Sequence, residues 1–227
     1  MKNIVCCLPL LCFIACSKSN STPGQPSPGN TQEKVLLDEQ FDNNSNGWAI
    51  QSINNVDSFG MQIDLSGYYL TIMGQNKART ALFPRTFFND TSAKAQYIEA
   101  SFWQTQGNTD VSFGIMFSTK NANDKYSFLI NSEGYYLIYS MKPNGVNDST
   151  IVNWTSSNLI NPMPNKNILR IVKQQNNFTF FINGQQILQK NLMANISLDW
   201  MAFQESTFGD DPSGVVVVDY VKLWETF

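Results

Sequence analysis

Histidine is absent from the 227-residue sequence, and its absence excludes several kinds of active site. A Ser-His-Asp triad and a Cys-His dyad need an imidazole base, and the usual zinc or iron sites need it as a ligand. An enzyme built from this chain would depend on carboxylates, Tyr, Lys or a metal bound by oxygen ligands. The net charge of −3 offers no basic surface, so we expect no nucleic-acid partner.

Cysteine is confined to the start of the chain. The four cysteines are Cys6, Cys7, Cys12 and Cys16, so the remainder has no cysteine with which to form a disulfide. These cysteines lie in an apolar run, and no second pair of ligands follows it. The spacing therefore argues against a metal cluster as well.

Residues 1–15 have the composition of a signal peptide, in which Lys2 precedes an apolar run shorter than the ~20 residues that span a bilayer. The segment ending in Ala15-Cys16 resembles a bacterial lipobox, although Phe13 stands where that motif normally has Leu. The resemblance implies cleavage before Cys16, lipidation of its thiol and an anchor in the outer membrane of the bacterial cell envelope. The sequence does not indicate whether the protein lies on the periplasmic or the outer face of that membrane. The alternative is a secreted protein with an unmodified Cys16.

Residues 16–33 follow as the lipidated cysteine and a linker. The linker is rich in Ser, Pro, Gly and Asn and offers almost nothing to bury, so we expect a disordered tether. Residues 34–227 are then a single domain.

The domain from residue 34 shows short strand-like runs between turn clusters such as "NSEG" and "KPNG", without a helical period. This pattern predicts an all-β fold, a jelly-roll sandwich of two antiparallel sheets. The expected strands are Val35–Phe41, Gly67–Gly74, Gln96–Thr105, Val111–Thr119, Lys125–Asn131, Tyr135–Met141, Asn167–Gln175, Phe178–Gly184, Gln185–Asn191, Leu198–Gln204 and Val215–Glu225.

Alternation within the strands predicts which side chains face outward. In Gln96–Thr105 the apolar residues at 98, 100 and 102 point into the core, whereas Tyr97, Glu99 and Trp103 point out. In the next strand the outward residues, such as Ser112 and Gly114, are small. We expect Tyr97, Glu99 and Trp103, beside these small residues, to bind carbohydrate on one open face. The alternative is that a loop covers them.

Trp154 is a further candidate for carbohydrate binding. It follows a long polar loop, Asn144–Thr150. An aromatic ring at such a place either stacks on a sugar or caps the edge of the sandwich.

Four stretches in the order "LLDEQFDNNSNGW", "SGYYLTIMG", "NILRIVKQQNNFTFFINGQQI" and "VVVVDYVKLWE" resemble the concanavalin A-like lectin/glucanase superfamily. The similarity spans Lys34 to Glu225 and is to its laminin-G-like, family-sixteen glycoside hydrolase and 3-keto-disaccharide hydrolase-like members. It implies two curved antiparallel sheets, with a concave face that binds glycan in the relatives that have that function.

Asp219 lies within the apolar last strand, where an uncompensated carboxylate is costly. In several of the relatives the first and last strands lie together, and the last-strand Asp ligates calcium. The resemblance thus implies a structural calcium site formed by Asp219 with Asp38 and Glu39. The alternative is that Asp219 accepts backbone hydrogen bonds or pairs with a lysine.

The laminarinase motif Glu-x-Asp-x-x-Glu is missing, and Glu133 in the corresponding region lies in a turn. We therefore expect a protein that binds carbohydrate and has no catalytic residues. One alternative is a hydrolase of the 3-keto-disaccharide type, in which Glu99 lies opposite a second acid. Another is a lipoprotein with a structural or protein-interaction role.

Overall fold

The computed structural model describes residues 32–53, 58–64, 66–74, 76–118, 125–142, 149–192, 196–208 and 213–227. The predicted signal peptide, Cys16 and most of the linker lie outside these residues. No helix that is long and apolar enough to cross a membrane occurs in the part of the chain that is described.

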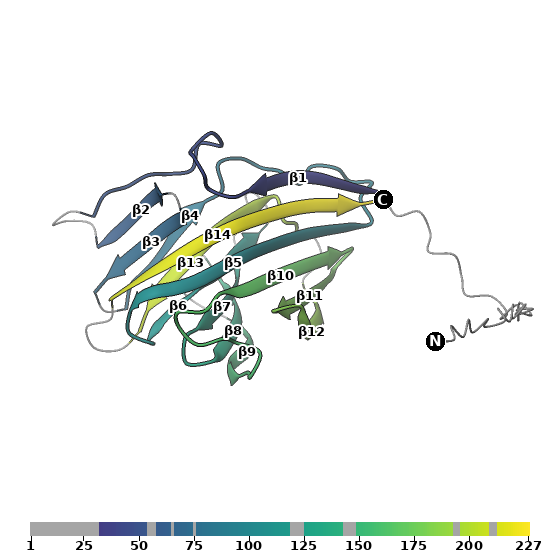
Figure 1. Cartoon of the computed structure of the whole chain (residues 1–227). Helices are drawn as coiled ribbons and strands as arrows, with labels where there is room; N and C mark the ends of the chain where they lie inside the picture. The colour runs from purple at the N-terminus through teal and green to yellow at the C-terminus, as the bar shows by residue number, and fades with distance from the viewer. Residues whose placement is uncertain are drawn as a thin grey trace, which may run out of the picture. The chain divides into compact units, whose positions relative to one another are not determined.

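Two antiparallel sheets form the domain, which confirms the all-β sandwich (Figure 1). The eight-stranded sheet has the order β12-β11-β10-β5-β14-β3-β2, with β1 paired to β14, and the six-stranded sheet has the order β4-β13-β6-β7-β8-β9. The strands in the described residues are β1 (Glu33–Glu39), β2 (Phe59–Asp64), β3 (Gly67–Met73), β4 (Ala78–Leu82), β5 (Ala95–Gly107), β6 (Val111–Ser118), β7 (Lys125–Asn131), β8 (Tyr135–Met141), β9 (Ser149–Ser156), β10 (Asn167–Gln174), β11 (Asn177–Ile182), β12 (Gln185–Asn191), β13 (Trp200–Thr207) and β14 (Ser213–Thr226).

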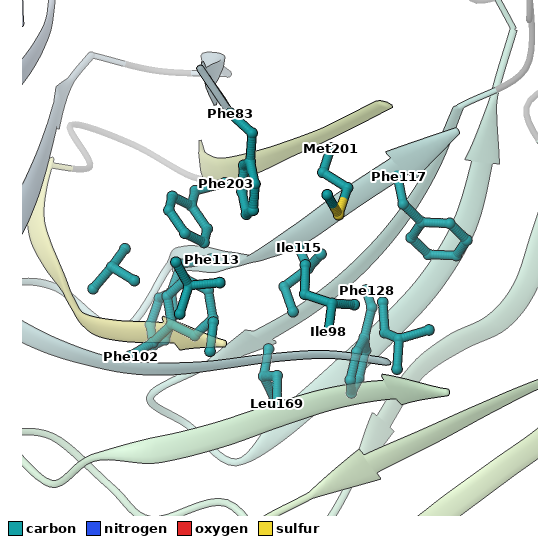
Figure 2. Close-up of a cluster of buried hydrophobic side chains, with 14 of the residues drawn as sticks. Phe83, Ile98, Phe102, Phe113, Ile115, Phe117, Phe128, Leu169, Met201 and Phe203 are labelled. Carbon is teal, nitrogen blue, oxygen red and sulfur yellow. The ribbon is translucent and has the colours of Figure 1, made fainter. Parts of the chain in front are cut away.

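The hydrophobic core lies between the two sheets and follows the expected alternation. Phe102 and Leu169 enter it from the eight-stranded sheet, and Phe113, Phe128 and Phe203 enter it from the six-stranded sheet (Figure 2). All five side chains are essentially inaccessible to solvent. Burial of such rings is the main favourable contribution to the folding free energy.

The first and last strands lie side by side, as the resemblance implies: β1 pairs with β14 so that Asp38 lies opposite Lys222. The tight turn that joins β11 to β12 is also as expected. Its two residues, Asn183 and Gly184, have φ of 49° and 81°, the left-handed conformations that an Asn-Gly hairpin turn requires.

Three strands were not anticipated from the sequence, namely β2, β4 and β9. Each one is the outermost strand of its sheet. Edge strands bury fewer side chains, so the alternation of apolar and polar residues that indicates a strand is weaker in their sequences. In β9, for example, five of the eight residues are exposed and none is fully buried.

The expected single open face over residues 97–114 is wrong. β5 belongs to the eight-stranded sheet and β6 to the six-stranded sheet, although they follow each other closely in the chain. The outward side chains of β5, including Tyr97 and Trp103, therefore lie on the opposite side of the sandwich from Ser112 and Gly114.

Candidate functional site

The aromatic rings of Trp154 and Phe208 meet across the outer face of the six-stranded sheet. Trp154 lies on β9 rather than in a loop, and Phe208 directly follows β13. Three strands separate β9 from β13, which in a flat sheet would place them about 19 Å apart. The two ring centroids are nevertheless only 6.1 Å apart, edge to face at 84°. This end of the sheet face is therefore a trough that the two rings bridge.

A cavity of about 260 Å³ lies in this trough. Ser112 of β6 and Asn131 of β7, which are directly paired in register, both line it. Ser112 is only 1% exposed, and its buried Oγ has no hydrogen-bond partner among the described residues. A buried hydroxyl without a partner is costly, so a hydrogen-bonding ligand or water at this place would stabilise the protein.

The remaining lining residues are two carboxylates and a partly exposed ring. Asp110 directly precedes β6, and Glu133 lies in the turn between β7 and β8 as expected. The hydroxyl of Thr109 donates a hydrogen bond of 2.8 Å to Oε1 of Glu133 and so orients it. Tyr135, at 39% exposure, lines the cavity beside Glu133. The cavity thus combines aromatic surface with hydrogen-bonding groups.

Sequence reasoning anticipated Trp154 but missed the other members of this cavity. Asp110, Tyr135 and Phe208 lie at strand ends that meet only because strands far apart in the sequence are neighbours in the sheet. The sequence signal for the cavity was Ser112, a small residue on the outward side of a strand that is rich in large apolar residues. Small outward side chains leave room for a ligand above a sheet.

Tyr97 and Glu99, two other predicted carbohydrate-binding residues, lie on the outer face of the eight-stranded sheet and contact other side chains. Tyr97 stacks on Trp224 with ring centroids 4.8 Å apart. Glu99 accepts hydrogen bonds from Arg170 Nε at 2.6 Å and from the Tyr220 hydroxyl at 2.9 Å. Burial, together with the Glu99 carboxylate, raises the pKa of Tyr220 above its ordinary value.

The hypothesis that Glu99 lies opposite a second acid is wrong. Its cross-strand neighbours are Arg170 on β10 and Lys222 on β14, both of them cations. This arrangement neutralises Glu99 and provides no carboxylate pair.

Trp103 and Asp219 share a single lysine on the same outer face. The ammonium of Lys166 lies 4.6 Å from the centroid of the Trp103 ring and 2.8 Å from Oδ2 of Asp219. The register between β14 and β5 shifts between Val218 and Tyr220, so Asp219 is the extra residue of a β-bulge. Its side chain is 30% exposed. The carboxylate is therefore not inside the core, and the observed partner is the lysine of the alternative explanation.

The three residues predicted to bind calcium have separate partners. Glu39 is buried and accepts hydrogen bonds from the Phe41 amide, the Asn46 amide group and the Trp48 indole N–H. Asp38 accepts one from Gln40. Among the described residues, no group of three or more His, Cys, Asp or Glu side chains is placed to hold a metal ion. With these separate partners the three residues do not fit a calcium cage, and the melting temperature in chelator tests the predicted site.

No family model matches the sequence, and no curated protein matches it. Solved structures do match. One comes from work on endo-acting O-glycanases with which members of the human gut microbiota initiate mucin breakdown (TM-score 0.61, 9% identity, 84% of this chain and 98% of that chain). Another is a family 16 endo-glucanase from Bacteroides ovatus (TM-score 0.58, 12% identity, 83% and 100%). A third is SCLam, a non-specific endo-β-1,3(4)-glucanase of family 16 (TM-score 0.55, 10% identity, 85% and 91%).

These similarities show the fold: the domain shares the two-sheet β-sandwich of these structures, a concanavalin A-like fold. Since the identities are low, they show the fold and not the activity. The similar structures include family 16 glycoside hydrolases, whose activities are properties of those proteins.

Proposed function

We propose that this protein binds carbohydrate in the cavity beneath Trp154 and Phe208 and does not cleave it. The observation that carries the proposal is the trough itself, in which two aromatic rings lie above a buried hydroxyl that has no partner among the described residues. Aromatic rings pack against the apolar faces of sugars, and the Ser112 hydroxyl and Asn131 amide can exchange hydrogen bonds with sugar hydroxyls.

The absence of cleavage rests on the outward side chains of the central strands. On β7 these are Ser127, Leu129 and Asn131, and on β6 they include Ser112 and Gly114. None of them is a carboxylate. Retaining hydrolysis needs two carboxyl groups about 5–5.5 Å apart on either side of the scissile bond. The outward side chains of these two strands thus supply binding groups without a carboxylate pair.

The proposal is tested with a glycan array probed with the purified full chain. We expect binding in the micromolar to millimolar range, about −4 to −8 kcal/mol, and loss of the array signal in Trp154→Ala. Trp103→Ala is the matched control, because Trp103 lies on the opposite face. If Trp103→Ala removes binding and Trp154→Ala does not, the glycan binds on the face that contains Tyr97 and Glu99 instead. An array without signal would favour the structural or protein-interaction alternative.

A hydrolase is the second candidate function, because Asp110 and Glu133 line the same cavity. Two carboxylates in one cavity are the minimum that glycoside hydrolysis requires. Its test is the release of reducing sugar, or of a 3-keto sugar, from glycans that bind. If the wild type releases sugar, and Glu133→Gln abolishes this release while glycan binding is retained, the protein is a hydrolase.

We also propose that the protein is a lipoprotein anchored through Cys16 to the outer membrane of a bacterial cell envelope. The proposal is supported by the apolar leader that ends in Ala15-Cys16, and acyl chains insert at about 0.8 kcal/mol per buried CH₂. Cys16→Ser is expected to move the protein from the membrane pellet to the soluble fraction. Native protein without lipid mass would contradict the anchor.

A further inference from the structure

The cavity is lined by carboxylates without a cation among its described lining residues, whereas the cations on the opposite face of the sandwich are paired with acids. Two carboxylates, Asp110 and Glu133, line the cavity, and no Lys or Arg is among its described lining residues. On the eight-stranded sheet, by contrast, Lys166 lies over Trp103 and Lys222 lies over Trp224, with ammonium-to-centroid distances of 4.6 and 5.2 Å. The cavity is therefore acidic, whereas on the opposite face Lys166 pairs with Asp219 and Lys222 with Glu33.

We propose that the cavity accepts neutral and amino-bearing glycans and discriminates against glycans that carry carboxylate or sulfate groups. The proposal rests on the proposed function and identifies the class of glycan for that same cavity. Ser112 supplies an observation that is independent of the acids, because its buried Oγ lines the cavity without a partner among the described residues. A ligand hydroxyl or amine that satisfies it would lie within a few ångströms of the cavity's acidic rim.

The position of Glu133 strengthens the effect of its charge. Its Oε1 accepts the hydrogen bond from Thr109, so the carboxylate is held in place at the rim. Glu133 also lines a second cavity, of about 440 Å³, together with Gly134, Ser156 and Asn158. A glycan that extends from one cavity to the other would pass directly over this carboxylate.

Elementary electrostatics sets the size of the effect. Like charges a few ångströms apart at a protein surface repel by an amount that corresponds to about tenfold in affinity. Salt screens such an interaction, since the Debye length falls from about 10 Å at 0.1 M to about 3 Å at 1 M ionic strength. Discrimination against anionic glycans should therefore weaken as the salt concentration rises.

Three β-1,4-linked tetrasaccharides with different charges test the proposal by calorimetry on the full chain. These are cellotetraose, the glucosamine tetramer and the glucuronic acid tetramer. We expect the glucuronic acid tetramer to bind about tenfold more weakly than cellotetraose at low salt, and the glucosamine tetramer to bind at least as well as cellotetraose. In the double variant Asp110→Asn/Glu133→Gln the three affinities should converge to within about twofold.

The matched control is Asp38→Asn/Asp42→Asn, which removes the same number of exposed acids from a different part of the domain. This control should keep the wild-type ranking. Equal binding of the three tetrasaccharides to the wild type, or a ranking that both double variants change alike, would overturn the proposal while leaving carbohydrate binding intact.

A second readout needs no glycan and separates this proposal from the proposed function. Fluorescence quenching of Trp154, isolated as the difference between wild type and Trp154→Phe, is measured with caesium and with iodide at equal ionic strength. We expect caesium to quench Trp154 several-fold more effectively than iodide, and Asp110→Asn/Glu133→Gln to remove the difference. Equal quenching in the wild type would overturn the acidic cavity. Selective quenching with no tetrasaccharide bound would contradict the proposed function alone.

Discussion

The indole N–H of Trp48 donates a hydrogen bond of 3.0 Å to the buried carboxylate of Glu39. The ring of Trp48 also stacks on Phe203, with centroids 5.5 Å apart, between the two sheets. Glu39 therefore connects the end of the first strand to the aromatic core. This is a structural role for a residue that the resemblance implied as a metal ligand.

Replacement of Glu39 is expected to destabilise the domain. Glu39→Gln keeps the size of the side chain but places an amide NH₂ among three N–H donors, so at least one donor loses its acceptor. Loss of a buried hydrogen bond to a charged group costs about 1.5–3 kcal/mol. Urea unfolding at pH 7 measures the change in the free energy of unfolding. The control is Asp38→Asn, at the exposed position directly before Glu39. A change below about 0.5 kcal/mol would contradict the structural role.

The buried carboxyl of Glu205 should make stability fall as the pH rises. Glu205 is fully buried in β13, and neither of its oxygens has a partner among the described residues. Burial raises the pKa of this carboxyl well above its ordinary value. The folded state thus favours the protonated form, so stability is greatest below the unfolded-state pKa of about 4.3 and falls, by up to about 1.4 kcal/mol per pH unit, as the pH rises towards the folded-state pKa.

Glu205→Gln removes this titration. We expect the variant to gain stability over the wild type at pH 7 and to gain much less at pH 4, as measured by urea unfolding at both pH values. If Glu205→Gln gains the same stability at pH 4 and pH 7, ionisation of the Glu205 carboxyl does not lower the stability of the wild type, and the prediction is wrong.

The ion pair between Lys166 and Asp219 should contribute little to stability. Both side chains are partly exposed, and exposed pairs typically contribute up to about 1 kcal/mol. Asp219→Asn should therefore lower the free energy of unfolding by less than this amount. Because Lys166 already supplies the counter-charge, we expect the same melting temperature in calcium and in chelator. A melting temperature that chelator lowers, and that Asp219→Asn makes insensitive to chelator, would establish the predicted calcium site.

Local sequence patterns predicted most of the fold, because apolar runs bounded by turn residues mark most of the strands, and alternation shows which side chains of β5 face the core. Ile98 and Phe102 are buried as the alternation predicts, and Tyr97 lies outside. The bulge at Asp219 was not predictable in this way, since one extra residue in a strand leaves its composition unchanged. The sequence did not indicate the edge strand β9, because none of its residues is fully buried.

The candidate site was predicted only in part, because it is made by contacts between distant strands. Trp154 was visible as an aromatic residue near a polar segment. Its contact with Phe208 depends on which strands lie between β9 and β13 and on how the sheet curves. Neither property is encoded in a short stretch of sequence. The assignment of Tyr97 and Trp103 to the same face as Ser112 failed for the same reason, since strands adjacent in the chain belong to different sheets.

NMR of the indole N–H resonances of the five tryptophans during a glycan titration tests whether glycan binds in the cavity beside Trp154. Each signal is assigned by a single Trp→Phe substitution, and the titrant is the neutral glycan with the strongest array signal. Trp154 lies at the cavity, whereas Trp103 and Trp224 lie on the opposite face beside Lys166 and Lys222. We expect the Trp154 signal to shift with saturation and the Trp103 and Trp224 signals to stay in place. Saturating shifts at Trp103 or Trp224 with an unchanged Trp154 signal would contradict binding in the cavity.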